Sequence, residues 1–271
     1  MSAPEWFAAN RANWDERVPI HLRSYDLTAL RAGRGVLHPI EEGEFQVTPG
    51  ERVLHLQCHF GADTLTLAQR GALVTGVDFS PVAIAAARVL AMELGLTARF
   101  VEANVYEAPQ VLPEPGGFDR VFVSWGALCW LPDMVGLAKV VSYYLRPGGQ
   151  LYLIEGHPAA LVFDDLAAGA DGNPGWFAPY FHEEALVLDD ERDYSDPNAR
   201  LDNKRTYEWM HPIGTIVEAL RSNGLAIDFL REHDQVPWRM FAQLVEGNGG
   251  MYRWPAKRWL PLSFSLSAVK R

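Results

Sequence analysis

Val53-Leu54-His55-Leu56-Gln57-Cys58-His59-Phe60-Gly61 is the stretch that decides how this chain folds. Its first four residues predict a short buried strand, and residues 62–70 predict a helix that ends at Gly71, so a tight turn must join the two. The same unit follows at once. Residues 73–77 predict a second strand, and Ser80-Pro81, an N-cap followed by proline, begins a helix over residues 82–94.

Strands and helices continue to alternate along the chain. A helix over residues 134–145 ends before Pro147-Gly148-Gly149. Helical connections between strands imply crossovers, and therefore parallel pairing with helices on both faces of the sheet. The two last strands are expected to pair antiparallel at the edge. The pattern predicts an α/β fold with a doubly wound, mostly parallel, seven-stranded sheet. Its further strands are predicted at residues 99–102, 119–124, 150–155, 226–231 and 262–269.

We expect a single domain over residues 1–271, in four parts. The core of alternating strands and helices covers residues 51–155 and follows an N-terminal helical cap over residues 1–50. Residues 156–205 interrupt the alternation with glycines, prolines, acids and aromatics, which indicates a lid or insertion after the fifth strand. Residues 206–271 supply a closing helix and the edge strands.

Composition narrows the possible partners. The chain has 271 residues, 48% hydrophobic and 21% charged, and a net charge of −10, which disfavours nucleic acid as a partner because the phosphate backbone repels it. No run of about 20 apolar residues and no signal-peptide pattern occurs, so we expect a cytoplasmic protein without membrane contact. Two cysteines, Cys58 and Cys129, are too few for a disulfide framework or a cysteine zinc site, and no metal is expected. The oligomeric state is left open.

Asp78, at the end of the second strand, is the strongest candidate for a binding residue. In a doubly wound sheet a carboxylate at this place faces a ribose diol bound over the first turn. The alternative is that Asp78 only begins the turn before Ser80-Pro81. A dinucleotide would require Gly-x-Gly-x-x-Gly so that the backbone can approach its pyrophosphate, but here Gln57 and His59 precede Gly61. The turn therefore favours a nucleoside cofactor that has no phosphate.

The order of these segments resembles the class I S-adenosylmethionine-dependent methyltransferases, within a bacterial group similar to methyltransferase types 11 and 12. The resemblance spans residues 52–155, and the tail around Tyr207-Glu208-Trp209-Met210-His211-Pro212 and Trp238-Arg239-Met240-Phe241 is similar to that group as well. It rests on five segments in the family's order: the first turn, Gly76-Val77-Asp78-Phe79-Ser80, Val101-Glu102-Ala103-Asn104-Val105, Phe118-Asp119-Arg120-Val121-Phe122 and Leu145-Arg146-Pro147-Gly148-Gly149.

The resemblance implies S-adenosyl-L-methionine as the cofactor and residues 51–155 as the part that binds it. In such a site the first turn wraps the methionine part, Asp78 holds both ribose hydroxyls, Phe79 lies against adenine, and the loop after the fourth strand lines the sulfonium. A faint similarity to thiopurine and halide methyltransferases places Trp14 near the adenosyl group, although Trp14 could equally pack on the sheet edge. The implied cofactor-binding residues are Trp14, Gln57, Cys58, His59, Gly61, Asp78, Phe79, Asn104, Val105 and Ser124.

The first turn departs from the family pattern at three positions. His55 stands where the family has an acid, and Gln57 and His59 stand at its first two glycines. Neutral imidazole offers one donor and one acceptor and cannot replace a carboxylate in every hydrogen bond. We therefore expect altered contacts to the cofactor. Arg17 could pair with the cofactor's carboxylate or form a surface ion pair.

The acceptor is expected to be a small molecule that is methylated on oxygen, nitrogen or sulfur. If a base is needed, we predict His211, because Tyr207, Trp209 and His211 precede a helix at the mouth of the sheet and combine an apolar wall with a titratable group. A capping or core histidine is the alternative. The other titratable candidates are Glu155, His157 and His182. Two further functions stay open: a nicotinamide-dependent oxidoreductase on a similar sheet, and a non-catalytic ligand-binding relative.

Overall fold

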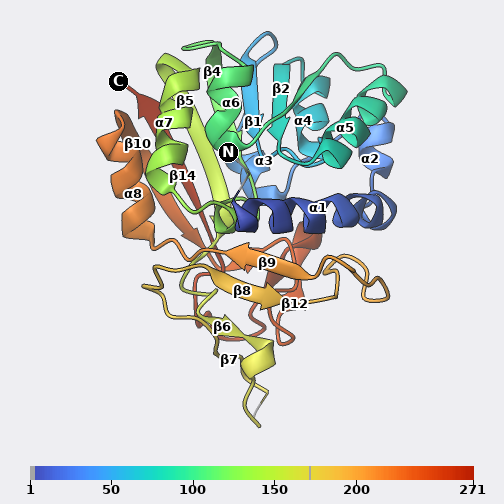
Figure 1. Ribbon diagram of the computed structural model, residues 1–271, viewed down its shortest axis with the longest axis vertical. Coiled ribbons are helices and arrows are strands. Elements are labelled where there is room, and N and C mark those ends of the chain that lie inside the picture. The colour runs from blue at the N-terminus through green and yellow to red at the C-terminus, as the bar shows by residue number, and fades with distance from the viewer. Residues whose placement is uncertain (1–3, 171) are drawn as a thin grey trace.

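The structure is a computed structural model that describes residues 4–170 and 172–271. Its centre is a seven-stranded sheet in the order β10-β14-β5-β4-β1-β2-β3 (Figure 1). Only β14 runs against its neighbours, because it pairs antiparallel with both β5 and β10. The predicted fold class is confirmed. The strands are β1 Arg52–Leu56, β2 Leu73–Asp78, β3 Arg99–Glu102, β4 Phe118–Val123, β5 Leu145–Gly156, β10 Leu225–His233 and β14 Ser263–Lys270.

Helices cover both faces of the sheet, because alternate residues of each strand point to opposite sides. In β1, Val53 packs into one buried cluster with Phe45 and Leu67, whereas Leu54 and Leu56 pack into another with residues of α7 and α8. Ser80 caps α5 as predicted, since its hydroxyl accepts a hydrogen bond from the Ala83 amide at 3.0 Å. The core helices are α4 Ala62–Gln69, α5 Pro81–Glu93, α6 Ala108–Val111, α7 Met134–Tyr144 and α8 Ile213–Ser222.

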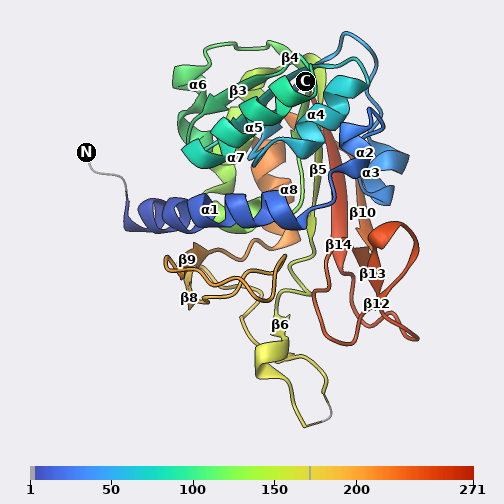
Figure 2. The same ribbon diagram turned by 90° about the vertical axis from the view of Figure 1, so that its right-hand side faces the viewer.

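The N-terminal cap is α1 Glu5–Ser24, α2 Thr28–Arg31 and α3 Pro39–Glu44. Helix α1 lies across the carboxyl ends of the strands, between the sheet and the hairpin β8–β9 (Figures 1 and 2). The side-chain amide of Asn10 exchanges two hydrogen bonds of 2.8 Å with the backbone of Tyr207 in β9. The cap and the segment after β5 are therefore in direct contact.

The segment after β5 forms small sheets rather than one continuous lid. The boundary predicted at residue 205 falls at the first residue of β9, which pairs with β8. Among the described residues no helix has both the length and the apolar character that crossing a membrane requires. The short strands are β6 Phe163–Asp164, β7 Gly175–Trp176, β8 Leu186–Asp189, β9 Arg205–Glu208, β11 Gln235–Val236, β12 Val245–Glu246 and β13 Tyr252–Arg253, and 3-10 turns cover Val105–Glu107, Leu128–Trp130, Asp165–Ala167 and Asn248–Gly250.

The loop after β4 is held in place by the carboxylate of Glu155 at the end of β5. Its Oε1 accepts hydrogen bonds from the amides of Gly126 and Gly156, both at 2.7 Å. Its Oε2 accepts from Ala127 at 2.7 Å and Leu128 at 2.9 Å. Burial raises the pKa of Glu155, and these four backbone donors partly offset that effect. With its oxygens so engaged, Glu155 orients the loop and is not available as a base.

Replacing this carboxylate by an amide is expected to destabilise the protein. In Glu155→Gln one side-chain oxygen becomes an NH2 group that faces backbone donors, which leaves them without an acceptor. We expect the free energy of unfolding to fall by about 2–3 kcal/mol, measured by urea unfolding. The exposed Glu246→Gln is the matched control and should stay within about 0.5 kcal/mol of the wild type. Equal stabilities for the two variants would contradict this role of Glu155.

Candidate active site

The turn between β1 and α4 keeps the backbone shape of a glycine-rich turn without most of the glycines. Gln57, His59 and Gly61 have φ angles of 56°, 51° and 79°, so every second residue is left-handed. Glycine adopts this conformation freely, whereas a residue with a side chain pays about 1–2 kcal/mol. Gly61 is required here for space too, because a Cβ at this position would lie 2.7 Å from the ring of Phe100.

Asp78 holds this turn from the end of β2. Its Oδ2 accepts a hydrogen bond from the His59 amide at 2.8 Å, and its Oδ1 accepts from the Ser80 amide at 2.9 Å. Burial raises the pKa of Asp78 to about 6, against the lowering effect of these backbone donors. Asp15 of α1 approaches the same place and accepts a hydrogen bond from the Ser80 hydroxyl at 2.5 Å.

A small hollow lies beside Asp78, and Trp6 and Phe7 of α1 form part of its lining. Phe7 of α1 lies against Phe79, with ring centroids 5.6 Å apart. Asn104 turns its side-chain oxygen to the Tyr106 amide at 3.1 Å, so this oxygen caps the short helical turn that follows β3. Five predicted cofactor-binding residues line the hollow, together with two aromatics that the sequence analysis had not assigned, Trp6 and Phe7. The full lining is Trp6, Phe7, Gln57, Val77, Asp78, Phe79, Ala103, Asn104, Val105 and Trp130.

Two other predicted residues lie behind or above the turn. Cys58 is 3% exposed and packs into the core beside Phe60 and Phe100, so its side chain does not line the hollow. Trp14 stands on α1 with its ring perpendicular to that of His59 at 5.2 Å and to that of Trp130 at 5.4 Å. Trp14 therefore covers the turn, and the sheet-edge alternative is not the arrangement observed.

His55 replaces the family's acid with a neutral ring. Its Nδ1 lies 2.9 Å from the Thr64 hydroxyl and its Nε2 lies 3.2 Å from the Ser124 hydroxyl. Burial lowers the pKa of His55 to about 3. The ring thus joins the start of α4 to the loop after β4, and Ser124 is oriented by this contact.

Acid should remove the stability that neutral His55 provides. In the unfolded chain His55 takes up a proton below its ordinary pKa of about 6.5, whereas the folded chain resists it down to about pH 3. The contribution is complete above pH 6.5 and is lost as the pH falls from 6.5 toward 3, by up to about 1.4 kcal/mol per unit. In urea unfolding at pH 7 to 4.5, the advantage of the wild type over His55→Gln should shrink accordingly. Parallel pH profiles for the two proteins would refute the assignment.

Three buried polar atoms near the turn have no hydrogen-bond partner within the described part of the chain: Trp14 Nε1, Gln57 Oε1 and His59 Nδ1. Buried polar atoms are nearly always paired, so unpaired ones point to a ligand. Gln57 lines the hollow, and the ring of Trp14 lies against those of His59 and Trp130 next to it. Together with the carboxylate of Asp78 they offer donors and acceptors to a nucleoside that carries an amino-acid group. The residues present therefore fit S-adenosylmethionine.

His211 lies beside the loop after β4. Its Nε2 is 2.7 Å from the carbonyl oxygen of Leu131, to which it donates, and burial lowers its pKa. The neighbouring Trp209 amide donates to the carbonyl of Cys129 at 2.8 Å, which fixes the same segment. This contact matches the capping alternative, and the role of His211 as a base stays a prediction.

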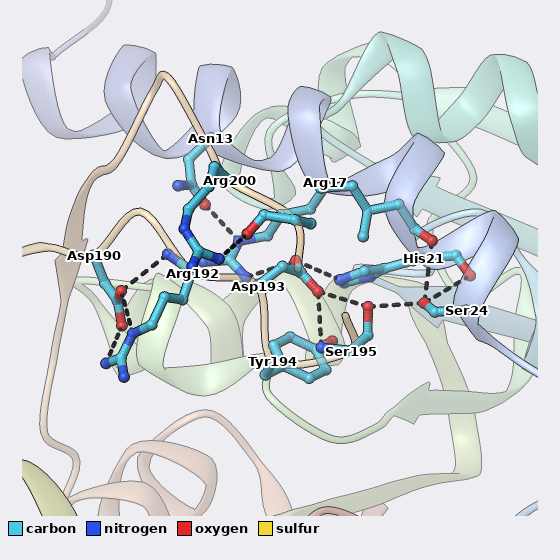
Figure 3. A network of polar contacts seen from close by, with 12 residues as sticks. Asn13, Arg17, His21, Ser24, Asp190, Arg192, Asp193, Tyr194, Ser195 and Arg200 are labelled. Carbon is cyan, nitrogen blue, oxygen red and sulfur yellow. Dashed lines mark hydrogen bonds and ion pairs between the residues drawn. The ribbon is translucent and has the colours of Figure 1, made fainter. Parts of the chain in front are cut away.

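A buried polar cluster between α1 and the insertion was not predicted. Arg17 is neither a surface residue nor free: its Nη1 contacts Asp193 Oδ2 at 3.0 Å, and its Nε donates to Asn13 at 2.7 Å (Figure 3). His21 Nε2 lies 3.1 Å from the same carboxylate oxygen. One sequence signal could have indicated this cluster, because Asn10, Asn13, Arg17 and His21 recur at helical spacing. In the structure all four side chains are buried.

Within residues 4–170 and 172–271, no three or more His, Cys, Asp or Glu side chains are grouped so as to hold a metal ion.

The fold and the turn agree with what known proteins of similar sequence and structure show. Residues 53–149 match the family model described as a methyltransferase domain, and this segment lies within residues 52–155, where the sequence resembles these enzymes. A ubiquinone biosynthesis O-methyltransferase of Pseudomonas aeruginosa is 34% identical over 122 residues, which is 44% of this chain and 51% of that protein. The chain thus spans about half the length of the curated relatives it matches.

Solved structures extend the similarity beyond the matched segment. An S-adenosylmethionine-dependent methyltransferase from Mesorhizobium loti superposes with a TM-score of 0.58 at 20% identity, over 86% of this chain and 96% of that one. A methyltransferase of the same kind from Methanosarcina mazei gives a TM-score of 0.55 at 22% identity, over 86% and 98%. At these identities the similarity concerns the fold alone.

Proposed function

We propose that this protein transfers the methyl group of S-adenosylmethionine to oxygen, nitrogen or sulfur of a small molecule. The observation that carries the proposal is the buried carboxylate of Asp78, which ties the glycine-type turn to β2 and lines the hollow beside that turn. Asp78 would hold the ribose hydroxyls, while Phe79, Asn104 and Val105 would surround adenine. The family model and the names of the relatives support the same activity.

The cofactor, when bound, supplies an electrophilic methyl group on sulfur, and the chain's own residues align it. Methyl transfer is an in-line displacement, and holding the two partners in a reactive geometry contributes several kcal/mol. Helix α1 covers the hollow with Trp6 and Phe7, which keeps water from the reacting groups. The loop held by Glu155 would line the sulfonium with Ser124. A net charge of −10 favours a small acceptor over a nucleic acid.

Removing the carboxylate of Asp78 is expected to abolish most cofactor affinity. The variant Asp78→Ala loses two charge-assisted hydrogen bonds of about 1.5–3 kcal/mol each, so the Kd for S-adenosylhomocysteine should rise at least about 100-fold in calorimetric titration. The exposed Asp228→Ala serves as the matched control and should bind as the wild type does. Unchanged affinity in Asp78→Ala would show that the ribose lies elsewhere. Binding of NAD(P)H without S-adenosylhomocysteine would favour the oxidoreductase.

Affinity should also fall in acid. The ionised carboxylate of Asp78 accepts hydrogen bonds from both hydroxyls, and its pKa of about 6 means that it is protonated below that pH. We expect affinity for 5′-methylthioadenosine, which keeps the ribose, to be constant above pH 7 and to decrease by up to tenfold per unit below pH 6. Titrations at half-unit intervals from pH 5 to 8 measure this, and a flat profile would contradict it.

A further inference from the structure

A continuous chain of buried polar contacts runs from the insertion through α1 to the first turn. Asp193 Oδ2 lies 3.1 Å from His21 Nε2, and His21 Nδ1 lies 2.8 Å from His59 Nε2. Figure 3 shows Asp193 between Arg17 and His21, with Ser195 on its other oxygen. Asp193 and His21 are 2% and 0% exposed, so water does not interrupt this chain.

The hydrogen-bonding rules allow two protonation states for the linked side chains of His59, His21 and Asp193. Burial alone would raise the pKa of Asp193, but hydrogen bonds from His21 and Ser195 lower it far below its usual range, so the carboxylate is ionised and His21 Nε2 donates to it. If His21 is neutral, its Nδ1 accepts a hydrogen bond from the protonated Nε2 of His59, and His59 Nδ1 has no hydrogen. If His21 is an imidazolium, its Nδ1 donates to His59 Nε2, and His59 Nδ1 carries a hydrogen.

The two states differ by one proton, and the positive charge of the second rests on His21 beside Asp193. A proton that enters at His59 Nδ1 releases the Nε2 proton of His59 to His21. Burial, with His21 close by, lowers the pKa of His59, so the positive charge of the second state does not rest on His59. The charged and titratable groups that face this pair are Arg17 of α1, Tyr25 at the C-cap of α1, Asp193 and Tyr194 of the insertion, and Asp78 of β2.

The unpartnered atoms at the turn match the amino-acid end of the cofactor. Trp14 Nε1 and a protonated His59 Nδ1 are two donors on rings 5.2 Å apart, which suits a carboxylate, and Gln57 Oε1 is an acceptor, which suits an ammonium group. Arg17 does not compete for the carboxylate, because Asp193 and Asn13 hold its guanidinium. Glycines at positions 57 and 59 would provide none of these side-chain contacts.

We propose that Trp14 and His59 bind the α-carboxylate of S-adenosylmethionine and Gln57 its ammonium group, and that the His59 donor is created by uptake of one proton into the His59–His21–Asp193 chain. This inference rests on the proposed function, because it assumes that the cofactor occupies the hollow. It gives the two side chains that replace the family's glycines a specific task. It also makes the insertion, through Asp193, a part of the cofactor site.

Two ligands that differ only at the amino-acid end test the proposal. S-adenosylhomocysteine carries the carboxylate and the ammonium group, whereas 5′-methylthioadenosine keeps the adenosine and the sulfur without them. In Asp193→Asn and in His59→Gly, which relaxes the turn at a left-handed position, the Kd for S-adenosylhomocysteine should rise about 10- to 100-fold. The Kd for 5′-methylthioadenosine should stay within about twofold. Asp190→Asn, at a half-buried residue of the same insertion that pairs with Arg192, is the matched control.

Proton uptake is measured directly by calorimetry at pH 8 in phosphate and in Tris, buffers with different ionisation enthalpies. Wild-type protein should take up close to one proton per S-adenosylhomocysteine and none per 5′-methylthioadenosine. Uptake with S-adenosylhomocysteine should disappear in both variants. Because the bound state needs the extra proton, the ratio of the two affinities should fall as the pH rises, and dividing one by the other removes the contribution of Asp78.

The outcomes separate the two hypotheses. If neither ligand binds the wild type, the proposed function itself fails. If both bind but no proton is taken up, or if the variants weaken both ligands equally, this inference is overturned and the proposed function stands. Thermal melting shows whether each variant folds. Should one not fold, the proton uptake and the pH dependence of the affinity ratio in the wild type decide alone.

Discussion

The carboxylate of Asp78 is the constraint on which the rest of the site depends. It accepts hydrogen bonds from the backbone on either side of β2's end, through His59 and Ser80, and so ties the first turn to the start of α5. A buried carboxylate with fixed backbone donors is rigid, and its raised pKa shows that burial costs it free energy. A further hydrogen-bond partner for the carboxylate would offset this cost of burial. Such a partner would bind in the hollow that Asp78 lines.

The second organising element is α1, which carries buried polar residues on one face and meets the insertion with them. Asn10 pairs with the backbone of β9, and Arg17 and His21 share the carboxylate of Asp193. Isolated buried charges are costly, so this cluster is stable only when the cap and the insertion are together. The two segments that cover the strand ends therefore behave as one unit.

The sequence analysis was accurate wherever local physics governs. Apolar alternation, the Ser80 cap and the proline after it located the strands and helices of the core, and the position of Asp78 after β2 predicted its place at the first turn. The division into four parts stays a prediction. The sequence analysis gave no role to Glu155 as the support of a loop, because the four amides that it holds come from segments about 30 residues apart or from its own neighbour.

By itself the sequence determined the sheet, the order of its elements and the carboxylate at the end of β2, because periodicity, caps and turn residues act over a few neighbouring residues. Only the tertiary structure decided what surrounds that carboxylate. His21 is 38 residues from His59 and 172 from Asp193, yet the three side chains touch. Contacts of that kind follow from how α1 and the insertion pack across the strand ends, and no local pattern encodes such packing.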